Sequence, residues 1–326
     1  MNDRFTFGVF VYNQEKEIIQ TLNSIKFQVI NYGSGIACNL IITDDCSKDS
    51  SKRIIDDWLS KNGDLFRKVI KIYNNENMGT VYNYHFILDH IDDEPFKIIA
   101  GDDLISFNNI FLTASSIGDH TFYNGFRLFF DDKKGVYYTE KFIHLQFWLN
   151  KSKMSRRQLI RLFKMGHIVS TPQTLYYKNL YVNANADELN SRFRLFEDNP
   201  TWYSIFKNVN DLDVIFDTKN LTLYRISDQS ISNRKKPNPV FKEELNQLYK
   251  LYMDEGTIIE KLFFKSLINN TPKFLNFSKY VNNFVFAKCK LFCLIYKKEY
   301  EAFRSEIMTQ FENGKKHYSN ICKMSE

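Results

Sequence analysis

The first hundred residues alternate between short apolar runs and amphipathic stretches, and this alternation limits the possible folds more than any other feature. Apolar runs typical of buried strands occupy residues 5–12, 38–45, 68–74 and 96–100. Apolar residues at helical spacing predict helices over residues 15–28 and 80–91, and a Ser47 N-cap with a stop at Gly63 predicts one over residues 47–63. This order predicts an α/β fold: a mostly parallel, Rossmann-like sheet with helices on both faces.

Polar residues follow three of these strands, and ligands of such sheets bind beyond the carboxyl ends of the strands. A set of carboxylates at one rim of a sheet suits a hard divalent cation and polar ligand groups. The pairs at the strand ends are Tyr12 and Asn13, Asp44 and Asp45, and Asp102 and Asp103.

Three nucleotide-binding classes lack their signature here. A P-loop NTPase needs a G-x-x-x-x-G-K-[ST] loop, which the 12 glycines do not supply. A Rossmann dehydrogenase needs G-x-G-x-x-G after the first strand, where this chain has YNQEKE, and the glycine-rich basic loop of a sugar nucleotidyltransferase is also missing. Alone, "GDD" is compatible with a solvated turn, and Glu197-Asp198 with a helix start in which Asn199 is the N-cap and Pro200 lies near N1.

After Asp103 the alternation ends. Residues 121–138 read as an antiparallel hairpin, and a polar, basic loop with two prolines precedes segments that are helical by period. These changes predict three segments: residues 1–105, residues 106–235, and a C-terminal helical region at 236–326.

The net charge of +6 is confined to the C-terminal part. From Arg234 to the end there are 17 Lys/Arg and 10 Asp/Glu, a local +7, so the first 233 residues sum to −1. The sequence has no apolar run long enough for a membrane span and does not begin like a signal peptide. Five cysteines without a C-x-x-C pair fit a reducing cytoplasm. A nucleic-acid partner is not expected, because basic and aromatic residues do not interleave along a groove pattern.

Six blocks in order resemble family 2 glycosyltransferases, enzymes of the GT-A fold that build bacterial surface polysaccharides such as capsule and O-antigen. The blocks are FGVFVYNQEKEIIQTLNSI, IITDDCSKDSS, NMGTVYNYH, AGDD, FEDNPTWY and YRISDQSIS. Tyr82 stands where the family has a small residue, and Ala100 where it often has the first aspartate of D-A-D-D. The resemblance covers roughly residues 5 to 234, so residues 1–105 would be the nucleotide-sugar half and 106–235 the acceptor half.

The resemblance implies a donor site on the first half. Asp103 matches the family's metal-binding aspartate, for Mn²⁺ or Mg²⁺, and Asp102 its neighbour that reaches the ribose or the water shell of the metal. Asp45 matches the residue that accepts a hydrogen bond from uracil N3–H, which favours UDP or dTDP over a cytidine donor. Tyr12 matches the aromatic residue that stacks on the base. Asp44 and Asn13 lie beside them in sequence.

The resemblance also places the chemistry on the acceptor side. Asp198 matches the catalytic base that takes the acceptor hydroxyl proton while the anomeric centre inverts, and Glu197 is the runner-up. The loop from Tyr224 onward would close over the diphosphate, with Arg225, Arg234 and Lys235 as cations and Asp228 unassigned. Residues 169–174 fall where acceptor loops lie in the family.

The expected function is therefore transfer from a nucleoside-diphosphate sugar, with UDP preferred, to a hydroxyl of a glycan or lipid-linked acceptor. A silent GT-A scaffold for a partner enzyme is the alternative that Ala100 leaves open. The basic C-terminal helices either contact the membrane surface, placing a cytoplasmic enzyme at the inner membrane face, or cap the catalytic domain or pair two subunits.

Overall fold

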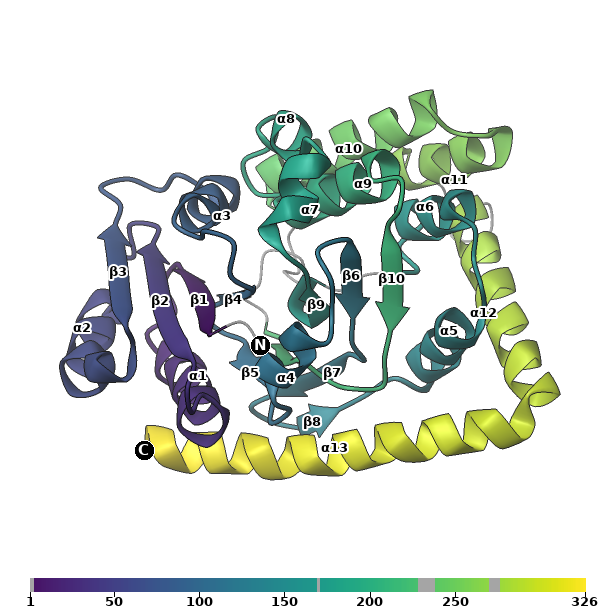
Figure 1. The fold of residues 1–326 in the computed structure, drawn as a ribbon. Coiled ribbons are helices and arrows are strands. Elements are labelled where there is room, and N and C mark those ends of the chain that lie inside the picture. The colour runs from purple at the N-terminus through teal and green to yellow at the C-terminus, as the bar shows by residue number, and fades with distance from the viewer. Residues whose placement is uncertain (1–2, 169–170, 228–237, 270–275) are drawn as a thin grey trace.

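The computed structural model describes residues 3–168, 171–227, 238–269 and 276–326. The N-terminal half is built around a four-stranded parallel sheet with the strand order β3-β2-β1-β4 (Figure 1). The strands are β1 (Arg4–Val11), β2 (Ala37–Asp44), β3 (Lys68–Tyr73) and β4 (Phe96–Ala100). Three of the strands, β1, β2 and β4, are mostly buried because helices cover both faces of the sheet, whereas the edge strand β3 is largely exposed or half-buried.

Helices pack on both faces of this sheet, as the alternation predicts. One face is covered by α1 (Ile18–Tyr32) and α2 (Ser51–Asn62), with the 3-10 turn η1 (Gly63–Leu65) after α2. The other face is covered by α3 (Thr80–Asp89). Gly8 of β1 permits this approach, because a Cβ at that position would lie 2.5 Å from the Ile87 side chain of α3.

The second half contains two smaller sheets, ordered β10-β6-β9 and β5-β11-β7-β8. The predicted hairpin over 121–138 is only partly correct, because β6 pairs in parallel with β10 and only β7 and β8 form an antiparallel hairpin. The chain changes sheets at Gly125, whose Cβ would lie 2.4 Å from the Lys219 carbonyl oxygen. The strands are β5 (Leu104–Ile105), β6 (Thr121–Asn124), β7 (Leu128–Asp131), β8 (Gly135–Tyr137), β9 (Thr174–Leu175), β10 (Asp213–Phe216) and β11 (Thr222–Arg225).

Short helices surround these sheets, and α7, α8 and α9 form the upper part of the molecule in Figure 1 together with α3, α10 and α11. A capping box at Ser155 and Gln158 fixes the start of α6. The helices are α4 (Ile110–Ser115), α5 (Glu140–Lys151), α6 (Arg156–Lys164), η2 (Thr171–Gln173), α7 (Lys178–Asn183), α8 (Ala186–Asn190) and α9 (Asp198–Asn208).

The C-terminal residues form long helices that share cores with the preceding halves. In the long α13, Ile307 and Ile321 are fully buried in the cluster that contains β7 and β11 residues, and His317 Nε2 donates a 2.8 Å hydrogen bond to the Ile105 carbonyl oxygen. The end of α13 reaches α1, where Asn23 Nδ2 donates to the Met324 carbonyl oxygen. These helices are α10 (Pro239–Asp254), α11 (Ile258–Ile268), α12 (Phe277–Ile295) and α13 (Lys297–Ser325).

Figure 1 shows α13 running under both halves, with α12 along the adjoining edge. A buried ion pair joins α11 to α6, where Lys164 Nζ lies 2.6 Å from Glu260 Oε1. None of the helices in the described ranges has both the length and the apolar character that crossing a bilayer requires.

Candidate active site

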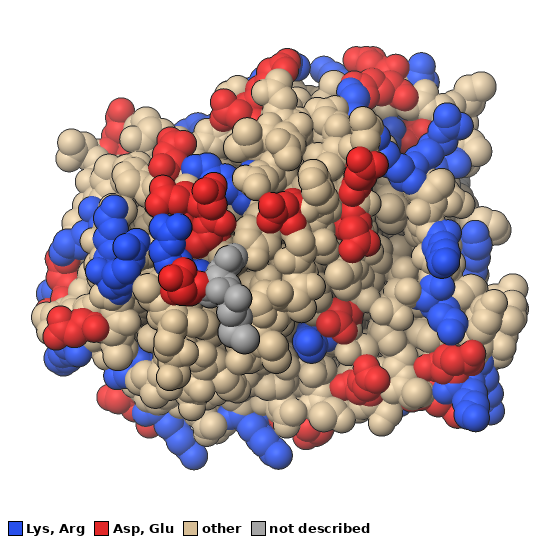
Figure 2. Space-filling view, in the orientation of Figure 1, with Lys and Arg blue, Asp and Glu red and all other residues tan. Residues whose placement is uncertain are grey.

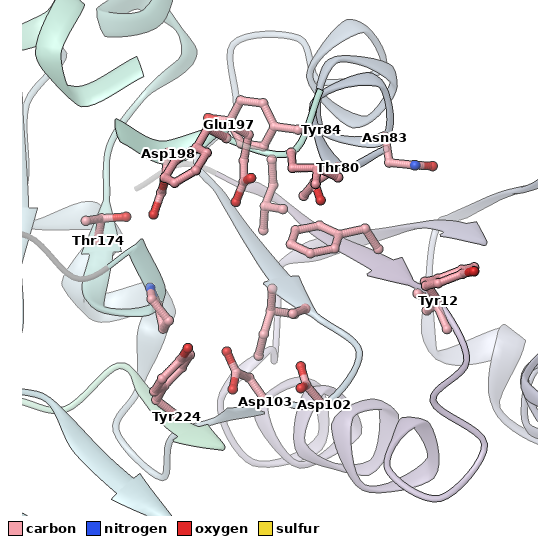
Figure 3. A pocket seen from close by; sticks show the side chains of 18 of the residues that line it. Tyr12, Thr80, Asn83, Tyr84, Asp102, Asp103, Thr174, Glu197, Asp198 and Tyr224 are labelled. Carbon is pink, nitrogen blue, oxygen red and sulfur yellow. The ribbon is translucent and has the colours of Figure 1, made fainter. Parts of the chain in front are cut away.

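A cavity of about 680 Å³ opens at the carboxyl ends of β1, β2 and β4 and extends to the start of α9. It therefore lies where the sheet topology predicts a ligand site. Figure 3 shows side chains from both halves around it. Seven of the nine predicted site residues line it: Tyr12, Asn13, Asp45, Asp102, Asp103, Glu197 and Asp198.

The turn after β1 is locked to the segment before α2. Asn13 has a left-handed backbone (φ 53°), and its N–H donates a 2.8 Å hydrogen bond to Ser47 Oγ. The prediction that Ser47 caps the following helix is therefore wrong: α2 begins at Ser51, and the Ser47 hydroxyl holds this turn instead. Tyr12 follows β1 with nearly half of its side chain exposed, so its ring is available to a ligand.

The two carboxylates after β2 have different surroundings. Asp45 lines the cavity and accepts hydrogen bonds from the N–H groups of Met78 (2.7 Å) and Gly79 (2.9 Å). Asp44 is fully buried, accepts from the Ser47 N–H at 2.8 Å and lies 3.6 Å from Lys52 Nζ. Among the described residues, Asp44 is not part of the cavity lining. Asp44 thus braces the loop that presents Asp45.

The "GDD" turn after β4 places Asp102 and Asp103 together in the cavity. Asp103 Oδ1 accepts a 2.8 Å hydrogen bond from the Arg225 N–H, and its carbonyl oxygen accepts from Thr21 Oγ1 at 2.7 Å. Burial raises the pKa of Asp102 to about 6, opposed by the Arg225 charge. Burial, together with the Asp102 charge, raises the pKa of Asp103 well above its usual range. The structure thus holds two carboxyl groups in surroundings that disfavour their charge.

Arg225 lies behind this turn, and the cavity lining, as far as the structure describes the chain, does not include it. Its Nε donates to the Asp102 carbonyl oxygen at 2.7 Å, and its other nitrogens donate to Asp132 Oδ1 and Gln20 Oε1, both at 2.5 Å. The guanidinium group lies 4.4 Å from the centre of the Phe130 ring. Arg225 therefore organises the "GDD" turn from within the protein.

These two aspartates fit a divalent cation only as part of a ligand set. Within the described residues, no group of three or more His, Cys, Asp or Glu side chains could hold a metal ion by itself. Mg²⁺ is commonly bound by one or two carboxylates together with substrate phosphates and water. Asp102 and Asp103 match that donor set, and their raised pKa values mark a place that a cation would stabilise.

A second pair of carboxyl groups faces the first across the cavity (Figure 3). Glu197 immediately precedes α9 and Asp198 begins it, and Asp198 Oδ1 accepts from the Asn199 N–H at 2.6 Å. Burial and the neighbouring Asp198 charge raise the pKa of Glu197 well above its usual range. Pro200 is the third residue of α9, close to the expected N1 position.

Several lining residues escaped the sequence analysis. Lys97 is a buried lysine on β4 whose Nζ donates to the carbonyl oxygens of Pro172 (2.8 Å) and Thr174 (2.9 Å). Burial lowers the pKa of its ammonium to about 7. The presence of a lysine inside the apolar run FKIIA was a sequence signal for a functional or buried polar residue at position 97. Tyr84, Tyr176 and Trp202 form an aromatic wall in which the last two rings meet edge to face, 4.9 Å apart.

The structure describes only part of the predicted acceptor loop and of the predicted closing loop. Residues 169–170 lie outside the described residues, while Pro172 and Thr174 line the cavity. Asp228, Arg234 and Lys235 of the predicted closing loop also lie outside the described residues. The described beginning of the same loop contributes Tyr224 and Ser227 to the cavity lining.

Comparison of the sequence and of the fold with known proteins points to one family. Residues 6–180, more than half of the chain, match the sequence model described as glycosyl transferase family 2. No curated protein matches the chain significantly. The chain resembles S. aureus TarS 1-349 in complex with UDP-GlcNAc, with 16% identity and a TM-score of 0.56, over 98% of this chain and 92% of that one.

Two further TarS structures have a TM-score of 0.51. S. aureus TarS 1-349 is 16% identical over 98% of this chain and 91% of its own. A structure of S. aureus TarS is 17% identical over 82% of this chain, and the match spans only 43% of that longer protein. At these identities the likeness establishes a common GT-A fold.

Proposed function

The chain belongs to glycosyl transferase family 2, and on that basis we propose that it transfers a sugar from a UDP-sugar to a hydroxyl group of a glycan or lipid-linked acceptor. The observation that carries this proposal is the pairing of two carboxyl clusters across one cavity, Asp102 with Asp103 on one side and Glu197 with Asp198 on the other. A solved structure of the same fold, from S. aureus TarS, holds UDP-GlcNAc.

The donor nucleotide would bind beside the ends of β1 and β2. Tyr12 presents its half-exposed ring for stacking on the base. Asp45 Oδ1 accepts from the Met78 N–H and from Asn74 Nδ2, whereas Oδ2, among the described residues, accepts only from the Gly79 N–H and can accept a second hydrogen bond. It therefore retains capacity for the uracil N3–H. Asn13 and Asp44 would fix the loops that carry these two contacts.

The diphosphate would lie against the "GDD" turn. When bound there, Mn²⁺ or Mg²⁺ held by Asp103 and Asp102 would supply positive charge that stabilises the departing nucleoside diphosphate. Arg225 contributes by fixing the turn, since it donates to the Asp102 carbonyl oxygen and the Asp103 carboxylate. Thr21 holds the same turn from α1.

The acceptor hydroxyl would approach from the side of α9. Asp198 would accept the hydroxyl proton as the oxygen attacks the anomeric carbon, and attack opposite the leaving group inverts that centre. Glu197 is less suited to this task, because burial and the neighbouring Asp198 charge raise its pKa and so disfavour the charged form that takes up a proton. The aromatic wall of Tyr84, Tyr176 and Trp202 provides apolar surface for a sugar ring.

A donor screen tests this function. Purified protein is incubated with Mn²⁺ and a UDP-, GDP-, CDP- or dTDP-sugar, and release of the free nucleotide is measured. We expect release from a UDP-sugar, lost in Asp198→Asn and unaffected in Asp57→Asn on the exposed surface of α2. Release from a GDP-sugar alone would contradict the uracil assignment.

A silent scaffold is the second candidate, favoured by one observation: Ala100 ends β4 where the family often has an aspartate. Such a protein would bind nucleotide without turning it over. Nucleotide binding that persists while no sugar nucleotide releases its nucleotide, with or without candidate acceptors, would support the scaffold over the transferase.

A further inference from the structure

The outer surface of α12 exposes a stripe of large apolar side chains. Phe284 is 71% exposed and Ile295 is 67% exposed, whereas Cys289 and Cys293 on the inner side are buried. Residues spaced by three, four, seven or eleven positions lie on one face of a helix. The exposed stripe consists of Tyr280, Phe284, Leu291, Leu294 and Ile295.

The sequence around this stripe is basic up to Lys298, and acidic residues resume at Glu299 and at Glu301, whose Oε1 lies 3.8 Å from Lys297 Nζ. Residues 261–298 contain eight lysines and neither Asp, Glu nor Arg. On α12 itself, Lys279, Lys288 and Lys290 have no acidic partner within ion-pair distance among the described residues. Helical spacing puts Lys288 on one side of the stripe, and Lys279 and Lys290 on the other. The apolar stripe is thus bordered by lysines without acidic partners in the described part of the chain, of which Lys288 also lies 5.1 Å from the centre of the Trp148 ring on α5.

The position of α12 leaves this stripe open to solvent. α12 packs against α5 and α11 on its inner side and forms one edge of the molecule (Figure 1). Figure 2 shows Lys and Arg side chains beside uncharged surface along that edge.

We propose that the outer face of α12 docks on the surface of a lipid bilayer rich in anionic headgroups. A helix in this position places its apolar residues at the boundary between headgroups and acyl chains, while flanking lysines meet the anionic headgroups. Both requirements are met on α12, and the absence of acidic residues from 261 to 298 removes the repulsion that an anionic surface would otherwise cause.

A second copy of the chain fits this face less well. In a twofold dimer the same patch meets itself, so the lysines that border the stripe would approach the lysines of the other copy. Like charges opposite one another disfavour such a contact. The proposal concerns only this surface and does not depend on the proposed transferase activity, because the test below uses no sugar nucleotide.

The test is flotation of the full chain with vesicles of phosphatidylcholine alone or of phosphatidylcholine mixed with phosphatidylglycerol. We expect binding to the anionic vesicles that is at least about tenfold stronger than to the neutral ones and that weakens with added salt, because each lysine contributes about fivefold. Equal binding to both vesicles, or no binding to the anionic ones, would overturn the proposal.

Paired variants locate the contact. Leu291→Glu combined with Leu294→Glu is expected to reduce binding at least about tenfold, because two apolar anchors become anionic. The control is Leu112→Glu on α4, where the leucine is 59% exposed, close to the 58% of Leu291. It should bind like the unmodified chain. An equal loss in Leu112→Glu would overturn the assignment to α12.

Sedimentation of the same variants tests whether a second copy of the chain covers the outer face of α12. The unmodified chain and the Leu291→Glu, Leu294→Glu variant should have the same oligomeric state and the same thermal midpoint without vesicles. An oligomer that dissociates in the variant would show that a second copy covers this face and would overturn the lipid proposal.

Discussion

The backbone N–H of Arg225 donates a 2.8 Å hydrogen bond to Oδ1 of Asp103, although 122 positions separate the two residues in sequence. The contact joins β11 of the second half to the "GDD" turn of the first. Because the Arg225 guanidinium also holds the Asp102 carbonyl oxygen, one residue fixes both members of the acid pair. The geometry of the proposed diphosphate site thus depends on the packing of the two halves.

Arg225→Lys should therefore weaken both the fold and the donor site. Lysine keeps the charge but lacks the fork that reaches Asp102, Asp132 and Gln20 at once. We expect a loss of about 2–3 kcal/mol in the free energy of unfolding, measured by urea titration, and weaker UDP binding. Arg53→Lys, at an exposed position on α2, is the control and should change stability by less than about 0.5 kcal/mol.

Gly79→Ala should loosen the turn that holds Asp45. Gly79 has a φ of 93°, and a Cβ there would lie 2.6 Å from the Arg194 carbonyl oxygen. The cost should be about 1–3 kcal/mol in unfolding free energy, with weaker binding of UDP measured by calorimetry. Gly35→Ala is the matched control, because φ is 78° but the Cβ would meet nothing within 4 Å. Equal effects of both substitutions on UDP binding would contradict the role given to this turn.

Asp198→Asn and Glu197→Gln should separate the two candidate bases. If Asp198 takes the acceptor proton, its amide variant should lose about 10²–10⁴-fold in kcat while UDP affinity is kept. Glu197→Gln should lose less, because an amide resembles the protonated form that burial favours at this position. The reverse order of activities in a transfer assay would assign the base to Glu197.

The contribution of two buried histidines to the free energy of unfolding should fall as the pH drops from about 6.5 to about 4, whereas the raised pKa values of Asp102, Asp103 and Glu197 act in the opposite direction. Burial lowers the pKa of His167 and of His317 to about 4 in the folded chain, below the ordinary value of 6.5. At these two positions the unfolded chain binds more protons in this window, so acid removes their contribution to the stability of the folded chain. His317 contributes about 3 kcal/mol to the free energy of unfolding. This contribution is complete above pH 6.5 and is lost progressively as the pH falls to about 4.

Urea titrations across this pH range check that prediction by comparison of variants, since carboxyl groups titrate there too. His317→Gln should reduce the slope of stability against pH, and His120→Gln, at an exposed position, should leave it unchanged. An unchanged slope in His317→Gln would exclude His317 as the source.

The sequence predicts the parallel sheet well because its signals are local. Each of the first four strands is an apolar run of the right length, and the polar residues after them necessarily meet at one rim. The start of α2 is mispredicted because the Ser47 hydroxyl is used by Asn13, a partner 34 positions away. The sheet change at Gly125 likewise depends on a close approach to Lys219 that no local pattern encodes.

The candidate site shows the same contrast between local sequence signals and long-range contacts. Residues at strand ends and at the start of α9 could be identified from motifs, because those motifs are contiguous in sequence. Lys97 could not be assigned, since its partners, the carbonyl oxygens of Pro172 and Thr174, lie more than seventy positions away. The motif around Arg225 suggested contact with the diphosphate, whereas its described contacts are with the protein.

The measurement that tests the central claim most directly is the thermal midpoint of the chain with UDP, with and without Mn²⁺, in unmodified protein and in Asp103→Asn. A ligand that binds only the folded state raises the midpoint. We predict a rise with UDP that requires Mn²⁺, is abolished by EDTA and by Asp103→Asn, and persists in Asp57→Asn. No rise with UDP and Mn²⁺, or an equal rise in Asp103→Asn, would contradict the assignment of this cavity as a metal-dependent UDP-sugar site.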